Sequence, residues 1–256
     1  MNAWIARFTP RHPGLVGLLL SFCLALPQAR AATIITLDRG LFSLRYDCDN
    51  RTALRFAYRL TVDKGNAPRP RGFELDPSLP GHCQQQLSAA SYDRVAKGWD
   101  RGHLVTSNHL DHNPRSIALT HRMTNIVPQW RSFNQGVWRQ TEEIAECYRD
   151  LAPVQVYGGV LYNDPRNDHF LASHGIRTPD YFWKTLVTKD AAGRTQTLSW
   201  LFPNVPGLGP LDSYIVSIRA LEKRIGKQAV GITLPYALKT RVATRSWPLP
   251  KNCQPG

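Results

Sequence analysis

Five short runs rich in apolar, β-branched and aromatic residues most constrain the fold of this chain, because such runs are typical of β-strands. They cover residues 42–46, 54–62, 154–162, 181–188 and 195–202. Between the second and third runs, apolar residues recur at helical spacing over residues 135–151, and a shorter helix-like pattern covers 211–225. No composition break, linker or repeat divides residues 32–256. The sequence therefore predicts a single α+β domain.

Residues 1–31 have the features of a secretory signal peptide. Arg7 and Arg11 supply positive charge, residues 14–26 are apolar, and the Ala-Arg-Ala of residues 29–31 fits a cleavage site. A retained membrane anchor is the alternative, although a spanning helix needs about 20 apolar residues. We expect a cleaved leader and a mature protein that is secreted or periplasmic, with no membrane association.

The cysteines agree with export. Four of them follow the leader, namely Cys48, Cys83, Cys147 and Cys253. An even set in an oxidising compartment predicts two disulfides, and four cysteines leave three pairings open. A zinc site is the rival interpretation, but no two of these cysteines share a CxxC spacing.

The chain is strongly basic, with 32 Lys and Arg against 19 Asp and Glu and a net charge of +13. Loss of the leader removes three arginines and no acid, which leaves +10. A charge of this size says nothing about fold. It indicates polyanionic partners such as nucleic acid, an anionic membrane or an acidic polysaccharide.

The first cluster of chemically active side chains is Asp100-Arg101-Gly102-His103. A histidine titrates near neutrality and can act as a general base, while the planar guanidinium of an arginine suits phosphate. In an extended segment Arg101 and His103 project from the same face. Taken alone, the tetrapeptide favours the simpler interpretation of a salt-bridged turn.

Two further clusters follow. Asn125 and Gln129 frame a short apolar run, and Asn134 stands where the predicted helix begins. An asparagine there can cap the helix, or its carbonyl oxygen can bind Mg²⁺. Glu142 lies two turns further on, roughly on the same side, where a carboxylate could hold a metal-bound water or simply face solvent.

In order and spacing, three motifs resemble those of the DNA/RNA non-specific endonucleases, a family of secreted bacterial and mitochondrial nucleases. The motifs are Asp100–His103, residues 123–129 (MTNIVPQ) and residues 134–138 (NQGVW) with Glu142. The resemblance covers most of the mature chain, from about Ala53 to Leu221. It implies a ββα-metal core on a mainly antiparallel sheet flanked by helices. In that core a strand with the histidine and a second strand precede a helix that starts at the metal-binding asparagine.

The resemblance also implies roles for single residues. His103 matches the general base, Asn134 the direct protein ligand of Mg²⁺, and Glu142 the acid that holds the metal's water shell. Mn²⁺ is a candidate substitute for Mg²⁺.

Further positions match less directly. Arg101 corresponds to the arginine beside the catalytic histidine, Arg71 corresponds more loosely to a second active-site arginine, and Asn125 matches an active-site asparagine. Four residues before Asn125 the family often has another asparagine, where this chain has His121. We assign His121 no catalytic role.

The implied function is a secreted, Mg²⁺-dependent endonuclease that cleaves DNA and RNA with low sequence specificity. A catalytically degenerate, basic nucleic-acid-binding protein is one alternative, but His103, Asn134 and Glu142 are all intact. An exported zinc phosphoesterase using His109 and His112 is another. The turn predicted at Asn113-Pro114 favours structural or surface histidines instead.

The basic residues are concentrated in two stretches of the chain. Residues 51–71 contain six Lys and Arg against one acid, and residues 223–256 contain seven and no acid. Either these are solvated surfaces or they form a phosphate-binding track around the site. The activity should rise with pH through a histidine whose unperturbed pKa is ~6.5.

Overall fold

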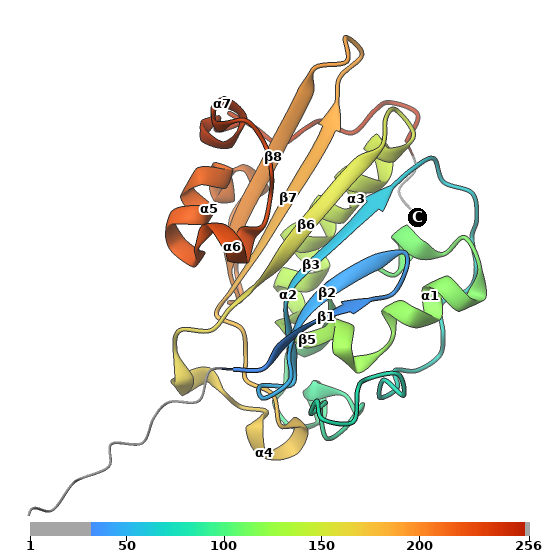
Figure 1. Ribbon diagram of the computed structural model, residues 1–256, viewed down its shortest axis with the longest axis vertical. Helices are drawn as coiled ribbons and strands as arrows, with labels where there is room; N and C mark the ends of the chain where they lie inside the picture. The colour runs from blue at the N-terminus through green and yellow to red at the C-terminus, as the bar shows by residue number, and fades with distance from the viewer. Residues whose placement is uncertain (1–31, 254–256) are drawn as a thin grey trace, which may run out of the picture. The chain divides into compact units, whose positions relative to one another are not determined.

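A six-stranded antiparallel sheet forms the centre of the molecule, with strand order β1-β2-β3-β6-β7-β8 (Figure 1). The structure, a computed structural model, describes residues 32–253. All five predicted strands are present and are joined by β1, which the sequence pattern did not predict. The strands are β1 Ile34–Asp38, β2 Phe42–Asp47, β3 Thr52–Leu60, β6 Val154–Leu161, β7 Tyr181–Lys189 and β8 Thr195–Pro203.

Alternation along the strands gives the sheet two different faces. In β3, Phe56 and Tyr58 are buried in the main core, whereas Arg59 on the other face is exposed. Helix α3 (Arg139–Arg149) packs on the main-core face, and α5 (Ile218–Ile225) covers part of the opposite face through a smaller cluster around Trp183 and Leu221. Figure 1 shows α3 behind the sheet and α5 in front of it. Glu142, one of the predicted site residues, lies on α3 and therefore on the main-core side of the sheet.

The predicted helix of residues 135–151 is present but begins earlier than expected. Helix α2 (Arg131–Phe133), a π-helical turn η4 (Asn134–Trp138) and α3 form one continuous path. Asn134 does not cap this helix, which was the alternative to metal binding, because Trp130 occupies the N-cap position and Asn134 lies inside the path. Gly136 has non-helical angles, φ −102° and ψ −115°, and accounts for the irregular turn.

A separate two-stranded antiparallel ribbon is formed by β4 (Trp99–His103) and β5 (Ile126–Trp130). This confirms the strand–strand–helix order of the ββα core. At Gly102 a Cβ atom would lie 2.2 Å from Oε1 of the buried Gln129, so glycine is required by close packing across the ribbon.

Short helices connect the remaining elements. Element η1 Tyr92–Arg94 precedes β4, and the connection from β4 to β5 contains η2 Asn108–Leu110, α1 Pro114–Thr120 and η3 Met123–Asn125. The later ones are η5 Pro165–Asn167, α4 Leu171–His174, η6 Leu211–Tyr214, α6 Lys227–Val230 and α7 Tyr236–Thr240. The helix pattern of residues 211–225 is thus divided into η6 and α5, and Oγ of Ser217 caps α5 by accepting a hydrogen bond from the backbone N–H of Ala220.

Two disulfides are present, as predicted, and the structure gives their pairing. Cys48 pairs with Cys83 and Cys147 with Cys253, with Cα–Cα distances of 4.5 and 5.5 Å. The second bond ties α3 to the C-terminal segment across 106 residues of sequence. The predicted leader lies outside the described residues, and within residues 32–253 no helix is long and apolar enough to cross a bilayer.

Candidate active site

One cleft of about 600 Å³ gathers residues from the first and third sequence motifs. Strand β4 contributes Arg101 and His103, the π-turn contributes Asn134, and α3 contributes Glu142. The other lining residues are Arg69, Phe73, Ser91, Asp100, Thr106, Ser107, Asn108, Gln135 and Arg139. The residues that the sequence marked as base, metal ligand and water-shell acid are therefore neighbours in space.

The imidazole of His103 is enclosed by aromatic rings. Its centroid lies 5.3 Å from that of Phe73 and 4.8 Å from that of His121, which meets it edge to face. Atom Nε2 is buried without a hydrogen-bond partner among residues 32–253, and the side chain lines the cleft. Burial holds the pKa of His103 well below its usual range, and His121, Arg69 and Arg101 lower it further. The ring is therefore neutral at pH 7 and able to accept a proton.

Arg101 and His103 both pack against the ring of Phe73. Its guanidinium carbon lies 4.1 Å from the ring centroid, and Nη1 donates a hydrogen bond to the carbonyl of Ala89 at 2.8 Å. Both side chains thus project from one face of β4, as the sequence predicted. Packing against Phe73 fixes the arginine beside the histidine.

Asn134 lies in sequence between two core aromatics and is hydrogen-bonded to one acid. Phe133 and Trp138 flank it in sequence, and both are fully buried against Phe182 of β7. Nδ2 of Asn134 donates a hydrogen bond to Oδ2 of Asp100 at 3.0 Å. Because an ionised carboxylate only accepts hydrogen bonds, this contact fixes the orientation of the amide and leaves Oδ1 free.

Asp100 connects three elements at this point. Its Oδ2 also accepts from Nε2 of Gln135 at 2.9 Å, and its Oδ1 accepts from Nε of Arg131 at 3.0 Å. The sequence placed Asp100 in the first cluster but gave it no role. Its position directly before Arg101 and close to His103 was a signal that Asp100 could have a role in the site.

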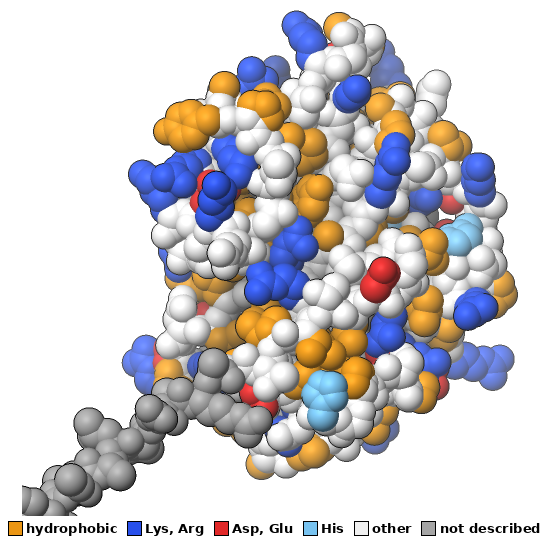
Figure 2. Space-filling view, in the orientation of Figure 1, with side chains coloured by type: hydrophobic (Ala, Val, Ile, Leu, Met, Phe, Trp, Pro, Cys, Tyr) orange, Lys and Arg blue, Asp and Glu red, His pale blue; other side chains and the backbone are white. Residues whose placement is uncertain are grey.

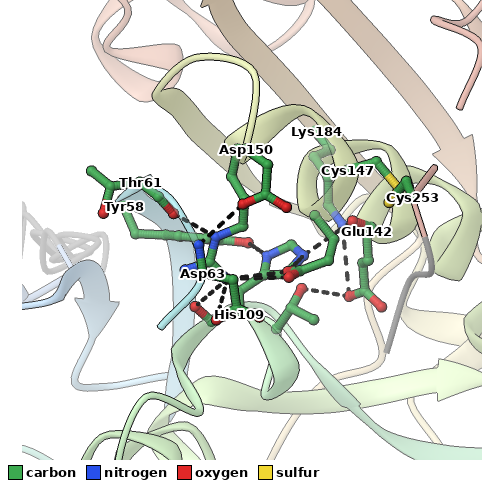
Figure 3. Close-up of polar contacts among 12 residues, drawn as sticks. Tyr58, Thr61, Asp63, His109, Glu142, Cys147, Asp150, Lys184 and Cys253 are labelled. Carbon is green, nitrogen blue, oxygen red and sulfur yellow. Dashed lines mark hydrogen bonds and ion pairs between the residues drawn. A yellow bond between two sulfur atoms is a disulfide. The ribbon is translucent and has the colours of Figure 1, made fainter. Parts of the chain in front are cut away.

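Glu142 projects from the first turn of α3, and its side chain is mostly buried. Figure 3 shows its carboxylate beside Lys184. Its Oε1 accepts a hydrogen bond from Oγ1 of Thr106 at 2.7 Å and lies 3.7 Å from Nζ of Lys184 in β7. Burial raises the pKa of Glu142 above its ordinary value, and the Lys184 ammonium and the Thr106 hydroxyl oppose that shift. Burial also lowers the pKa of Lys184 to about 8, which is still above neutral pH.

Two sequence candidates do not reach the cleft. Arg71 is exposed and does not line it, whereas Arg69, two residues earlier, does. Asn125 is fully buried: its Oδ1 accepts from the backbone N–H of Val105, and its Nδ2 donates to the carbonyls of Val105 and Thr120. Asn125 thus holds the segment that follows β4. Arg139, which the sequence analysis did not single out, also lines the cleft.

The two histidines that a zinc site would use, His109 and His112, form hydrogen bonds with neighbouring residues instead. His109 is buried, with Nδ1 hydrogen-bonded to the hydroxyl of Tyr58 at 2.8 Å and Nε2 to the carbonyl of Glu142 at 3.1 Å. Burial lowers its pKa to about 3. His112 pairs with Oγ of Ser116. Within residues 32–253 no three His, Cys, Asp or Glu side chains are grouped to hold a metal ion.

The cleft nevertheless suits a hard cation that keeps most of its water. Among residues 32–253 no hydrogen bond reaches Oδ1 of Asn134 or Oε2 of Glu142 at normal geometry, although the neighbouring Trp138 side chain also helps to lower the pKa of Glu142. Neutral and anionic oxygens of this kind suit Mg²⁺, which retains several waters and needs few protein ligands. The donor set therefore fits Mg²⁺ and does not fit a closed zinc site.

Fold and site together define the class of proteins with a ββα core. The profile of the DNA/RNA non-specific endonuclease family matches residues 28–238. The chain belongs to this family.

Several nucleases are similar to this chain in sequence. The chain is 27% identical over 203 residues to mitochondrial nuclease EXOG of Mus musculus, covering 72% of this chain and 54% of that protein. It is 26% identical over 204 residues to mitochondrial endonuclease G of Homo sapiens, covering 74% and 67%. It is 24% identical over 198 residues to a nuclease of Serratia marcescens, covering 75% and 73%. The chain thus spans about half the length of the mouse protein.

A solved structure agrees in fold. The EndoG/EndoGI complex contains a chain that superposes with a TM-score of 0.60 at 21% identity, covering 78% of this chain and 84% of that one. The predicted α+β fold is thereby confirmed.

Proposed function

We propose that this protein is a divalent-metal-dependent endonuclease that hydrolyses phosphodiester bonds in DNA and RNA with low sequence specificity. The observation that carries the proposal is the convergence of His103, Asn134 and Glu142 on one cleft. The three come from separate elements, β4, the π-turn and α3, so their meeting is a property of the fold.

His103 is the general base. Its neutral ring lines the cleft and at pH 7 can take a proton from the water that attacks phosphorus. General-base catalysis by a positioned side chain contributes about 10²–10⁴-fold. Phe73 and His121 hold the ring in place, so the proton acceptor needs no reorientation during the reaction.

Asn134 and Glu142 are the residues that would hold Mg²⁺, with Mn²⁺ as a candidate substitute. Oδ1 of Asn134 would bind the ion directly, and the carboxylate of Glu142 would hold water of its shell. A cation held there would supply positive charge to the phosphodiester during hydrolysis. Asp100 orients the amide, and Thr106 orients the carboxylate.

Arginines bind and orient the phosphodiester. Arg101 stands beside the base, and Arg69 and Arg139 line the same cleft. Guanidinium groups bind phosphate oxygens, which are identical along every DNA and RNA strand. Recognition through phosphate alone accounts for low sequence specificity and for the acceptance of both polymers.

Export is part of the proposal. A cleaved leader of residues 1–31 would place the mature protein, residues 32–256, in the periplasm or outside the cell. The pairing of Cys48 with Cys83 and of Cys147 with Cys253 supports an oxidising compartment. Intact mass of the protein from culture medium, periplasm and cytoplasm tests this, since removal of the leader leaves Ala32 as the first residue.

The decisive experiment incubates the purified protein with supercoiled plasmid and with RNA, in Mg²⁺ or in excess chelator. We expect both polymers to be cut in Mg²⁺ and neither in chelator. Full activity in chelator would contradict the metal-dependent mechanism. Binding of both polymers without cleavage in Mg²⁺ or Mn²⁺ would support a degenerate nucleic-acid-binding protein instead.

A further inference from the structure

Lys184 is a buried cation beside the proposed cation site. It lies in the middle of β7 on the α3 side of the sheet, and its side chain is 1% exposed. Nζ sits 3.7 Å from the centroid of the Trp138 ring and 3.7 Å from Oε1 of Glu142 (Figure 3). Among the described residues, Nζ has no partner at hydrogen-bonding distance. Glu142 is therefore the acid that balances this charge.

A lysine in this place is costly for stability. Burying an ammonium group without hydrogen bonds carries a large desolvation penalty, and an apolar side chain of similar volume often serves a core at least as well. The neighbouring inward residues of the same strand, Phe182 and Leu186, are apolar. The charge of Lys184 therefore needs an explanation other than packing.

The arrangement around Glu142 supplies that explanation. Thr106 and Lys184 both approach the same oxygen, Oε1, from different elements. Oε2 has no such partner among residues 32–253, and Glu142 lines the cleft. One carboxylate oxygen thus has two partners, Thr106 and Lys184, and the other has neither.

We propose that Lys184 is a positioning residue which, together with Thr106, holds Oε1 of Glu142 so that Oε2 is presented to the hydrated cation. The inference rests on the proposed function of the cleft. Outer partners of this kind typically change metal affinity by about 10–100-fold when removed.

A competing explanation predicts the opposite sign. If Lys184 acted only through space, its positive charge would repel a bound cation, and removing it would tighten metal binding. If Lys184 positions Glu142, removing it weakens metal binding, because the carboxylate loses its fixed orientation. The sign of the change therefore distinguishes the two roles.

The test is the equilibrium binding of Mn²⁺ to the whole mature protein without nucleic acid, followed by the EPR signal of free Mn²⁺. For Lys184→Met we expect the Kd to rise about tenfold or more. Thr106→Val should raise it in the same direction, because it removes the other group on Oε1.

A matched control is available elsewhere in the chain. Lys239 and Glu222 form another buried lysine–glutamate pair, with Nζ 2.6 Å from Oε1, and neither lines the cleft. Lys239→Met removes a comparable cation, so it should lower thermal stability while the Kd for Mn²⁺ stays that of the parent protein.

The outcomes separate this inference from the proposed function. An unchanged or lower Kd in folded Lys184→Met would overturn the positioning role, even if the parent protein cleaves DNA in Mg²⁺. If Lys184→Met does not fold, an unchanged Kd in Thr106→Val would overturn it. A parent protein that neither binds Mn²⁺ nor cleaves either polymer would overturn the proposed function as well.

Discussion

Oδ2 of Asp100 accepts a hydrogen bond from Nδ2 of Asn134 at 3.0 Å, and this contact determines which atom of the amide is left for a cation. A carboxylate cannot donate, so the NH₂ group must point toward it and the carbonyl oxygen away from it. Asp100 thereby orients a proposed metal ligand that lies 34 residues further along the chain.

Replacing Asp100 by Asn should remove that constraint, because the new amide can either donate or accept. We expect the Mg²⁺ concentration for half-maximal activity to rise about tenfold or more. Asp93→Asn is the control, since Asp93 also binds Arg131, at 2.8 Å, but does not contact Asn134. Equal Mg²⁺ titrations for the two variants would contradict the orienting role of Asp100.

His103→Ala and Asn134→Ala should fail in different ways. Without His103 the proton acceptor is lost, so turnover should fall by about 10²–10⁴-fold while the Mg²⁺ titration keeps its midpoint. Without Asn134 the titration should shift to higher Mg²⁺, and excess metal should restore part of the activity, because water supplies most of the ion's shell. A large midpoint shift in His103→Ala with none in Asn134→Ala would reverse the two assignments.

The pH profile should reflect the buried setting of His103. Burial and neighbouring positive charge lower its pKa well below its usual range, so the ring stays unprotonated, and active as a base, to lower pH. The acidic limb of kcat/KM should therefore lie below the ~6.5 expected for a free histidine. A limb at or above pH 6.5 would show that the free enzyme does not lower this pKa.

The same shift has a consequence for stability with a definite sign. Because the folded pKa of His103 lies below the unfolded value, the unfolded chain binds the proton first as pH falls. The contribution of this group is therefore present above about pH 6.5 and is lost as pH falls toward the folded pKa. In Leu or Phe variants of His103, urea unfolding should depend less steeply on pH between 6.5 and 4.

Close packing at Gly102 gives a prediction about stability. In Gly102→Ala the new Cβ atom would lie 2.2 Å from Oε1 and 2.6 Å from Cβ of Gln129, so the β4–β5 ribbon must move apart. Overpacking of this kind costs about 1–3 kcal/mol, which should appear as a lower urea midpoint. Gly72→Ala is the control, because a Cβ atom there meets no atom within 4 Å.

The strands and the order of the motifs were predictable because each follows a local pattern. Apolar runs identify β3, β6, β7 and β8, and the three motifs lie in the order that a ββα core requires. The path of the helix was less predictable. Phe133 and Trp138 are buried in the core, so the helical path starts before Asn134, and Asn134 lies in its π-helical turn. Asn134 consequently binds Asp100 instead of the helix end.

Residues that act through tertiary contacts left weaker signals. Lys184 occupies an inward position of β7 between Phe182 and Leu186. A lysine among the apolar, inward-facing residues of a strand was the one sign in the sequence of its role. Arg69 and Arg71 lie in a turn-rich loop without periodicity, so the sequence could not tell which of them reaches the cleft. Only the folded path of residues 63–82 decides this.

The basic C-terminal region is separate from the cleft. None of residues 223–253 lines it, and Figure 2 shows Lys and Arg gathered around α5 and α6, on the side of the sheet away from α3. Several of these groups have local partners: Lys239 binds Glu222, and Arg224 packs on the ring of Tyr181. A phosphate track within the cleft therefore depends on other arginines, namely Arg69, Arg101 and Arg139.

Arg69 and Arg71 provide a matched pair to test this track. Both are exposed arginines of one loop, but only Arg69 lines the cleft. Binding of a DNA duplex should weaken with salt, with a log–log slope of about −0.9 for each phosphate neutralised. Measured in a His103→Ala background that does not cut the duplex, Arg69→Gln should make the slope less steep by about one phosphate, whereas Arg71→Gln should leave it unchanged. If Arg71→Gln alone reduces the slope, the loop turns toward the substrate on binding and the looser sequence match was correct. If neither variant changes it, the duplex does not contact this loop, and Arg101 and Arg139 carry the track.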